Sequence, residues 1–249
     1  KSDWYVWAEP KPDGTPPNNW LSIFGGSAWQ WDGKREQYYL HNFLTSQPDL
    51  NFHNEEVRQA LLDVVRFWLD RGVDGFRLDT INFYVHDQEL RDNPPLAKEL
   101  RNDSIAPAVN PYNHQLHVYD KNRPENLDFL RRFRSLLDEY PGTTAVGEVG
   151  DAQIGLQIVA DYTSGNDKMH MCYAFEFLSS VPVTVERVRS VMSDFMAAAP
   201  EGWACWAFSN HDVVRHATRW GDNVNDRERY LRLLAGLIIS LRGSICLYQ

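Results

Sequence analysis

Three carboxylic acids, Asp79, Glu148 and Asp212, each follow a short apolar stretch that is typical of a buried strand. Arg77 precedes Asp79 by two residues, so both side chains are expected on one face of the strand, where the guanidinium keeps the carboxylate ionised. Glu148 lies between apolar neighbours, which raise the pKa of a carboxyl group toward neutrality. His211 stands beside Asp212 and offers a second hydrogen-bonding group.

Two carboxyl groups in unlike environments can cleave a glycosidic bond. The ionised one attacks the anomeric carbon and the protonated one supplies a proton to the leaving oxygen. Each acid alone has a simpler interpretation, as an ion pair at a strand end, a neighbour of a helix N-terminus or part of a local turn. The spacings of 69 and 64 residues put one acid on each of three strands, as a shared site at a barrel mouth would require.

The segments around these acids alternate between helical and strand-like patterns. Apolar residues at helical spacing run from residue 55 to Gly72, which is suited to end a helix. The strand-like runs cover residues 73–79, 143–149, 169–177, 203–209 and 244–249, with helical patterns between them. Because parallel neighbours need crossover helices, the sequence predicts an α/β fold with a parallel sheet of five strands. In such folds the active site gathers at the carboxyl ends of the strands.

Two segments depart from this alternation. Residues 1–53 are rich in Trp, Gly, Pro and Asn and are expected to form an irregular, loop-rich subdomain. Residues 54–249 then form the helix-and-strand portion, from which residues 83–124 make a long loop excursion with polar turns. Long loops in compact domains are usually functional.

Composition excludes some classes of partner. A net charge of -9 with 25 Lys and Arg residues argues against nucleic acid, whose phosphates need clustered cations. The longest apolar stretch, residues 231–241, is far shorter than the roughly 20 residues of a membrane span. Cys172, Cys205 and Cys246 lie in apolar or aromatic runs and are expected to be buried free thiols, which favours a reducing, cytoplasmic compartment.

The acids lie in recognisable motifs. The segments DGFRLDTIN, VGEV and FSNHD resemble the three catalytic motifs of the α-amylase superfamily (glycoside hydrolase family 13), and QPDLN at 47–51 resembles its fifth short motif. The resemblance covers nearly the whole chain and is closest to the bacterial α-glucosidases, because AEPKPDGTPPNNW and FGGSAWQWD are similar to their segments. It implies a partial TIM (β/α)8 barrel, about strands 4 to 8, with residues 1–53 as part of domain B.

The resemblance also implies a role for each site residue. Asp79 is expected to be the nucleophile, Glu148 the general acid and base, and Asp212 the stabiliser of the transition state. Arg77 and His211 are expected to contact the nucleophile and the sugar hydroxyls.

The resemblance implies roles for three more residues. Phe24 and Phe43 are expected to line the sugar site, where aromatic rings stack on the apolar face of a pyranose, unless they are core aromatics. Thr80 follows the nucleophile directly, as in enzymes that prefer α-1,4 linkages, whereas Val there resembles enzymes that cleave α-1,6 linkages.

The implied activity is that of a retaining α-glucosidase, which removes terminal glucose from maltose-like oligosaccharides or small α-glucosides through a covalent glucosyl-enzyme. Transglucosidases, sucrose isomerases and trehalose synthases share all three acids and remain alternatives. A non-catalytic binding subunit is a further alternative, although such proteins have generally lost the acids.

Several parts of the family pattern are expected outside this chain. The Asn-His motif, the first three barrel strands and a loop that can bind a structural calcium or magnesium ion should precede it, and a sugar-binding Arg and a β-domain should follow Gln249. We therefore expect a fragment whose partners are the missing N- and C-terminal segments, which is inactive alone. No metal ligand or other cofactor is expected within it.

Overall fold

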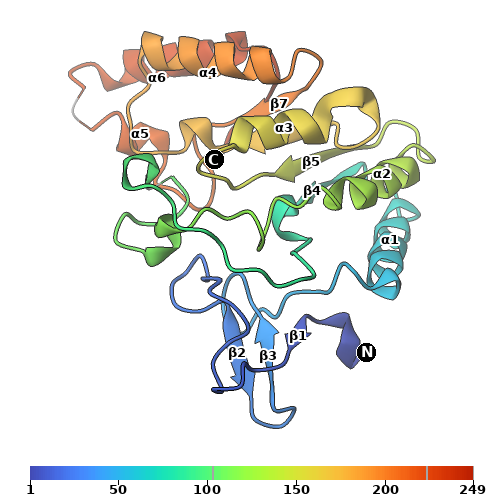
Figure 1. The fold of residues 1–249 in the computed structure, drawn as a ribbon. Coiled ribbons are helices and arrows are strands. Elements are labelled where there is room, and N and C mark those ends of the chain that lie inside the picture. Colours follow the sequence, from blue (N-terminus) through green and yellow to red (C-terminus); the bar gives the residue numbers. More distant parts are fainter. Residues whose placement is uncertain (103, 223, 249) are drawn as a thin grey trace.

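The computed structural model describes residues 1–102, 104–222 and 224–248. A five-stranded sheet with helices along its outer side makes up the larger part, and a small three-stranded sheet lies apart from it at the bottom of the view in Figure 1. The excursion, drawn mainly in green, runs between the two sheets.

The larger sheet is parallel throughout, with its strands in sequence order. Its strands are β4 (Gly75–Leu78), β5 (Thr144–Glu148), β6 (Met171–Ala174), β7 (Ala204–Trp206) and β8 (Ser244–Ile245). The intervening helices are α2 (Asn126–Leu137), α3 (Gly155–Thr163), α4 (Val185–Ala198), α5 (His216–Arg219) and α6 (Arg227–Ser240). This confirms the predicted α/β class, and the repeated strand and helix form part of a (β/α)8 barrel.

Helix α1 (Glu55–Leu69) leads into the first strand of this sheet. The Asn54 side chain accepts a hydrogen bond from the Glu56 N–H and caps the helix, and Gly72 adopts a φ of +84° just beyond its end. The buried face of α1 is narrower than the sequence predicts. Val64 and Trp68 fit the helical spacing, yet both are about half exposed.

The main core lies between the five-stranded sheet and its helices. Fully buried aromatic side chains fill it, among them Phe133, Phe177, Phe195 and Trp206. Trp206 also donates its indole N–H to the Arg242 carbonyl at 2.8 Å, so its polar atom is satisfied. Each large apolar side chain buried in this way contributes roughly 1.5–3 kcal/mol to stability.

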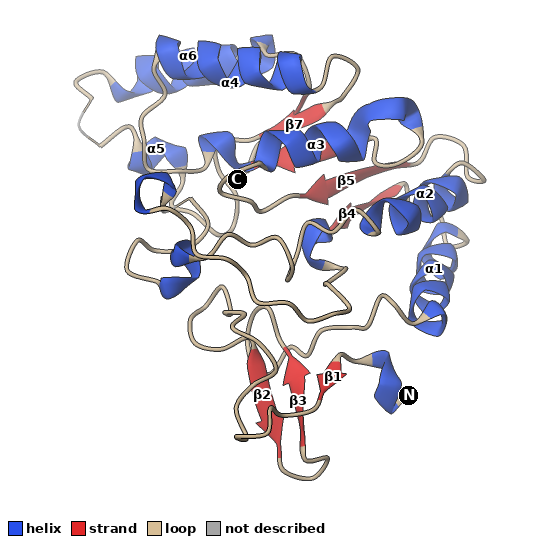
Figure 2. Cartoon of the chain, viewed as in Figure 1, coloured by secondary structure: helices blue, strands red, loops and turns tan. Residues whose placement is uncertain are grey.

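Before α1 the chain is mostly loop around a small antiparallel sheet (Figure 2). Its strands are β1 (Trp7–Ala8), β2 (Trp29–Asp32) and β3 (Gln37–Leu40), in the order β1-β3-β2. Trp20 stacks on Trp29 at 5.8 Å between ring centroids and forms the centre of a separate small core. The Trp20 indole N–H donates to the Arg91 carbonyl at 2.9 Å, which ties this region to the excursion.

The excursion is held in place by its contacts with other segments. Among its described residues there are short 3-10 turns, such as Lys98–Leu100 and Pro111–His114, but no α-helix or named strand. Asn110 donates its side-chain N–H to the Ile23 carbonyl at 2.9 Å, so the excursion is fastened to the N-terminal region.

No helix in the described part of the chain is long and apolar enough to cross a membrane. The three cysteines are free. Cys172 and Cys205 are buried as expected, but Cys246 is exposed, because it follows the last strand at an edge of the sheet.

Candidate active site

The first acid lies at the carboxyl end of β4. Arg77 is in the strand and Asp79 follows its last residue, and the Arg77 Nη1 and Asp79 Oδ1 atoms are 2.5 Å apart. The side chains of Arg77 and Asp79 are 41% and 71% exposed, so both are accessible to a ligand. The expected pairing of guanidinium and carboxylate is therefore present.

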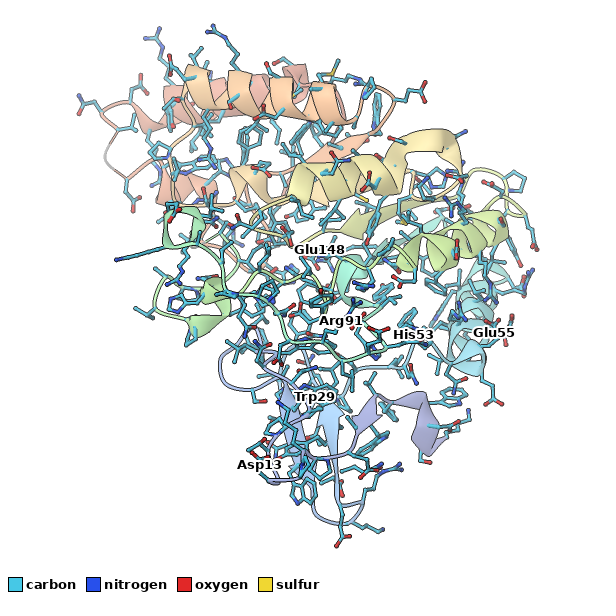
Figure 3. All side chains as sticks on the ribbon, viewed as in Figure 1. Asp13, Trp29, His53, Glu55, Arg91 and Glu148 are labelled. Atoms are coloured by element: carbon cyan, nitrogen blue, oxygen red, sulfur yellow. The ribbon has the colours of Figure 1, made fainter. Side chains whose placement is uncertain are left out.

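Glu148 is the last residue of β5, which lies next to β4. The second guanidinium nitrogen of Arg77 is 2.8 Å from Glu148 Oε1, and the Thr80 N–H donates to Oε2 at 3.2 Å. The Glu148 side chain is only 5% exposed and lies near the centre of the molecule in Figure 3. One guanidinium thus bridges the two carboxyl groups, one of them exposed and the other buried.

The backbone around these acids allows them to approach. A Cβ atom at Gly147 would collide with the Ile81 side chain and come within 3.3 Å of Cys172 Sγ, so only glycine lets the turn after Asp79 pack against β5. Thr80, at a φ of +43°, is in the left-handed region, which is unfavourable for a β-branched residue. This conformation directs its N–H toward Glu148.

The two acids have opposite pKa shifts. Burial, helped by the hydrogen bond with Asp79, raises the pKa of Glu148 to about 7, against the lowering effect of Arg77. Partial burial alone would raise the pKa of Asp79, but its hydrogen bonds with Glu148 and Arg77 lower it below the usual 3.8. Near neutral pH a protonated Glu148 can therefore donate its hydrogen to an ionised Asp79.

The third acid follows β7, which ends at Trp206, three residues earlier than the expected end of the strand at residue 209. Asn210 organises the turn beyond it, because its Oδ1 accepts the Asp212 N–H at 3.0 Å and its Nδ2 donates to Asp212 Oδ2 at 3.1 Å. His211 Nε2 lies 3.5 Å from Asp212 Oδ1. His211 also lowers the pKa of Asp79, after the larger effects of burial, Glu148 and Arg77.

Tyr173 and Asn210 lie near these acids, although neither is among the sequence-predicted site residues. Tyr173 is the residue of β6 that pairs with Glu148. Asn210 bonds Asp212, and it lowers the pKa of Tyr173 against the larger raising effect of burial. Burial is the main cause of the raised pKa of Tyr173, so the hydroxyl stays protonated. A polar residue near the carboxyl end of the strand between two acid-bearing strands is the sequence signal that could have found it.

The two predicted sugar-binding aromatics lie together. Phe24 is 66% exposed and meets Phe43 edge to face at 5.9 Å, so it is not a core residue. Phe43 in turn lies 5.2 Å from Phe83, whose ring borders Gly150, two residues after Glu148. Phe24 and Phe43 are thus linked through Phe83 to the loop that follows Glu148. Their sugar-binding role stays a prediction.

Comparisons with known proteins agree with this architecture. The family model "Alpha amylase, catalytic domain" matches residues 1–249. A protein of Rhizobium meliloti named "Probable alpha-glucosidase" is 71% identical over 249 residues, all of this chain and 45% of that protein. The oligo-1,6-glucosidase of Heyndrickxia coagulans is 34% identical over 264 residues, which are 99% of this chain and 44% of that enzyme. The chain thus spans about 45% of the length of these relatives.

Solved structures match the fold over its full extent. The α-glucosyl transfer enzyme XgtA superposes with a TM-score of 0.95 at 55% identity, covering 100% of this chain and 46% of that one. The trehalose-6-phosphate hydrolase of Bacillus licheniformis superposes with a TM-score of 0.81 at 28% identity, covering 100% of this chain and 43% of that one.

Proposed function

The chain belongs to the α-amylase catalytic-domain family, and within that family we propose that it is the acid-bearing part of a retaining α-glucosidase. The observation that carries this proposal is the pair formed by Asp79 and Glu148. One acid is ionised and the other protonated near neutral pH, and both contact Arg77. These are the protonation states that a nucleophile and a general acid require.

In the first step the protonated Glu148 donates its hydrogen to the glycosidic oxygen while an Asp79 oxygen attacks the anomeric carbon. The bond between that carbon and the leaving oxygen breaks, and its electron pair stays with the oxygen that receives the proton. The products are an alcohol and a glucosyl ester on Asp79. Glu148 is left as a carboxylate.

In the second step the Glu148 carboxylate takes a proton from water, and the water oxygen attacks the anomeric carbon and displaces Asp79. Two inversions return the original anomeric configuration. The shared contact with Arg77, at 2.5 Å to Asp79 and 2.8 Å to Glu148, supports this route, because inverting enzymes separate their carboxyl groups by about 6.5–9.5 Å to admit a water. Both steps as written use protein carboxyl groups and water.

The remaining site residues assist these steps. Asp212 and His211 bind sugar hydroxyl groups, and Asp212 also stabilises the positive charge of the transition state. Arg77 keeps Asp79 ionised and oriented. Phe24 and Phe43 lie in residues 1–53, which form part of domain B, and offer ring faces to the pyranose.

The substrate is a small α-glucoside or maltose-like oligosaccharide. The excursion 83–124 is hydrogen-bonded to the N-terminal region, and its length favours a narrow pocket that accepts a chain end. Thr80, directly after the nucleophile, favours α-1,4 linkages. The 71% identical relative named "Probable alpha-glucosidase" supports the proposal of an α-glucosidase within the family.

Glucosyl transfer is the second candidate, favoured by the 55% identity with the α-glucosyl transfer enzyme XgtA. The same glucosyl-Asp79 would then react with a hydroxyl group of another sugar or alcohol instead of water. The acids are the same in both reactions, so only the acceptor that reaches the intermediate distinguishes them.

The test is product analysis on maltose and sucrose with the full-length protein. Nuclear magnetic resonance of the glucose first released from 4-nitrophenyl α-glucoside, whose leaving group is not a sugar, should show the α-anomer, and Asp79→Ala should abolish the signal. Release of β-glucose from this substrate would refute the retaining mechanism. Disaccharide or trisaccharide products in place of free glucose would assign the protein to the transfer enzymes.

A further inference from the structure

The loop that follows Glu148 is fastened to the loop that follows Asp79. Asn82, three residues after Asp79, accepts the Gly150 N–H at 3.1 Å through Oδ1 and donates to the Gly150 carbonyl at 3.0 Å through Nδ2. Asn82 is 1% exposed, so water competes little with these bonds. Gly150, two residues beyond Glu148, is thereby held through both its N–H and its carbonyl group.

Lys121, near the end of the excursion, contacts the same loop. Its Nζ donates to the Gly150 carbonyl at 3.0 Å and lies 3.1 Å from Asp151 Oδ2. The side chains of Lys121 and Asp151 are 2% and 6% exposed, and Nζ lies over the Phe83 ring at 4.9 Å. A lysine is costly to bury, and it is tolerated here because the carboxylate and the carbonyl compensate its charge.

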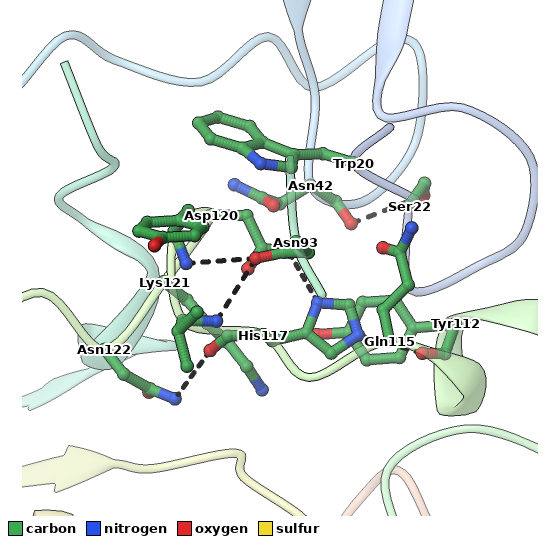
Figure 4. Close-up of polar contacts among 12 residues, drawn as sticks. Trp20, Ser22, Asn42, Asn93, Tyr112, Gln115, His117, Asp120, Lys121 and Asn122 are labelled. Atoms are coloured by element: carbon green, nitrogen blue, oxygen red, sulfur yellow. Dashed lines mark hydrogen bonds and ion pairs between the residues drawn. The ribbon is translucent and has the colours of Figure 1, made fainter. Parts of the chain in front are cut away.

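Asn122 also hydrogen-bonds to both loops, through Asn82 and Asp151. Its backbone N–H donates to the Asn82 carbonyl at 2.7 Å, and its Nδ2 donates to Asp151 Oδ2 at 2.7 Å. Asn122 adopts a φ of +59°, a conformation that Asn and Gly tolerate best. His117 accepts a weaker bond from Asn122 at 3.5 Å and contacts Asp120 at 2.6 Å, as Figure 4 shows.

Asp151 stays charged in this buried setting. Burial alone would raise the pKa of Asp151, but Lys121 and the hydrogen bonds from the Ile154, Gln153 and Asn122 groups outweigh it and lower the pKa to about 2. The Asp151 carboxyl group is therefore ionised near neutral pH. The removal of one partner would leave a buried charge without compensation.

We propose that Lys121 is a positioning residue for Glu148, an inference that rests on the proposed function. Through Gly150 and Asp151 it holds the loop that directs the Glu148 carboxyl toward the glycosidic oxygen. Lys121 contacts neither acid, so its effect is transmitted through this loop. Proton transfer needs hydrogen-bond geometry, so a small displacement of the acid slows the step that depends on its proton.

The test compares Lys121→Met with Lys168→Met in the full-length protein. Lys168 is a matched control, since its buried Nζ also bonds a carbonyl and a carboxylate, those of Ser164 at 2.7 Å and Asp167 at 2.6 Å. It precedes β6, at the end of the sheet opposite the acids. The readouts are kcat/KM for maltose, whose leaving group needs a proton, kcat/KM for 4-nitrophenyl α-glucoside, whose leaving group hardly does, and the melting temperature.

Lys121→Met should lower kcat/KM for maltose about tenfold or more beyond its effect on the aryl glucoside, within the contribution of about 10²–10⁴ that a general acid makes. Lys168→Met should lower the melting temperature and leave the ratio of the two substrates unchanged. Equal losses on both substrates with Lys121→Met would overturn the proposal, because they would indicate a merely structural role.

A second variant covers the case in which Lys121→Met does not fold. Asn122→Gly keeps the left-handed backbone and removes only the side-chain bonds to Asp151, Asn82 and the His117 carbonyl, so it should reproduce a smaller change in the same ratio. An unchanged ratio would overturn the proposal.

Glu148→Gln distinguishes a failure of the positioning role from a failure of the acid role. If Glu148→Gln loses activity on maltose and keeps activity on the aryl glucoside, but the Lys121 and Asn122 variants leave the ratio of the two substrates unchanged, the positioning role alone fails. If Glu148→Gln affects both substrates equally, the acid role fails and the positioning role fails with it.

Discussion

Raising the pH through 7 should stop the cleavage of maltose by removing the proton from Glu148. The pKa of Glu148 is raised to about 7, chiefly by burial and then by the hydrogen bond with Asp79. The protonated form is the active acid, so activity is present below this pKa and is lost above it. We expect kcat/KM for maltose to be half its maximum near pH 7 and to fall about tenfold per pH unit beyond it.

The size of this effect follows from the shift. With a pKa of about 7, about half of the Glu148 side chains are protonated at pH 7. At the ordinary value of 4.5 only about 0.3% would be protonated at that pH. The buried setting therefore increases the population of the working acid by a factor of roughly 150 at neutral pH.

The assay is kcat/KM against pH for maltose and for 4-nitrophenyl α-glucoside, with Glu148→Gln as the reference variant. The aryl glucoside should show a much weaker loss at high pH, since its leaving group departs without a proton. Glu148→Gln should lose maltose cleavage by about 10²–10⁴ and should retain formation of the glucosyl-enzyme from the aryl glucoside. A loss of maltose activity centred near pH 4.5, or identical profiles for the two substrates, would refute the assignment of Glu148 as the acid.

Three further predictions follow from the site geometry. Arg77→Met should move both limbs of the kcat/KM profile for maltose to higher pH, because Arg77 lowers the pKa of both acids; a shift to lower pH would contradict its role. Gly147→Ala should destabilise the fold by about 1–3 kcal/mol in chemical denaturation, since its Cβ would collide with Ile81, and an unchanged midpoint would show that the turn can move away. Thr80→Val should raise the ratio of isomaltose to maltose cleavage, and a constant ratio would remove Thr80 as a determinant of linkage.

Local sequence patterns predicted much of the fold. Alternating helical and strand-like patterns predicted the parallel sheet, because crossover helices are required between parallel strands. The same pattern placed Asp79 and Glu148 at strand ends, and neighbouring strands bring such ends together. It also extended β7 too far and overestimated the buried face of α1, because an apolar residue is equally compatible with a strand end, a loop or a partly exposed surface.

Local sequence patterns were enough to predict which acids stand at the carboxyl edge of the sheet and that Arg77 accompanies the first of them. They could not predict that one guanidinium bridges both acids, that Tyr173 pairs with Glu148, or that Lys121 and Asp151 form a buried ion pair. Strand and helix patterns depend on neighbours along the chain. Burial and Coulomb interactions depend instead on distances in space, as between Lys121 and Asp151, which are 30 positions apart in the sequence.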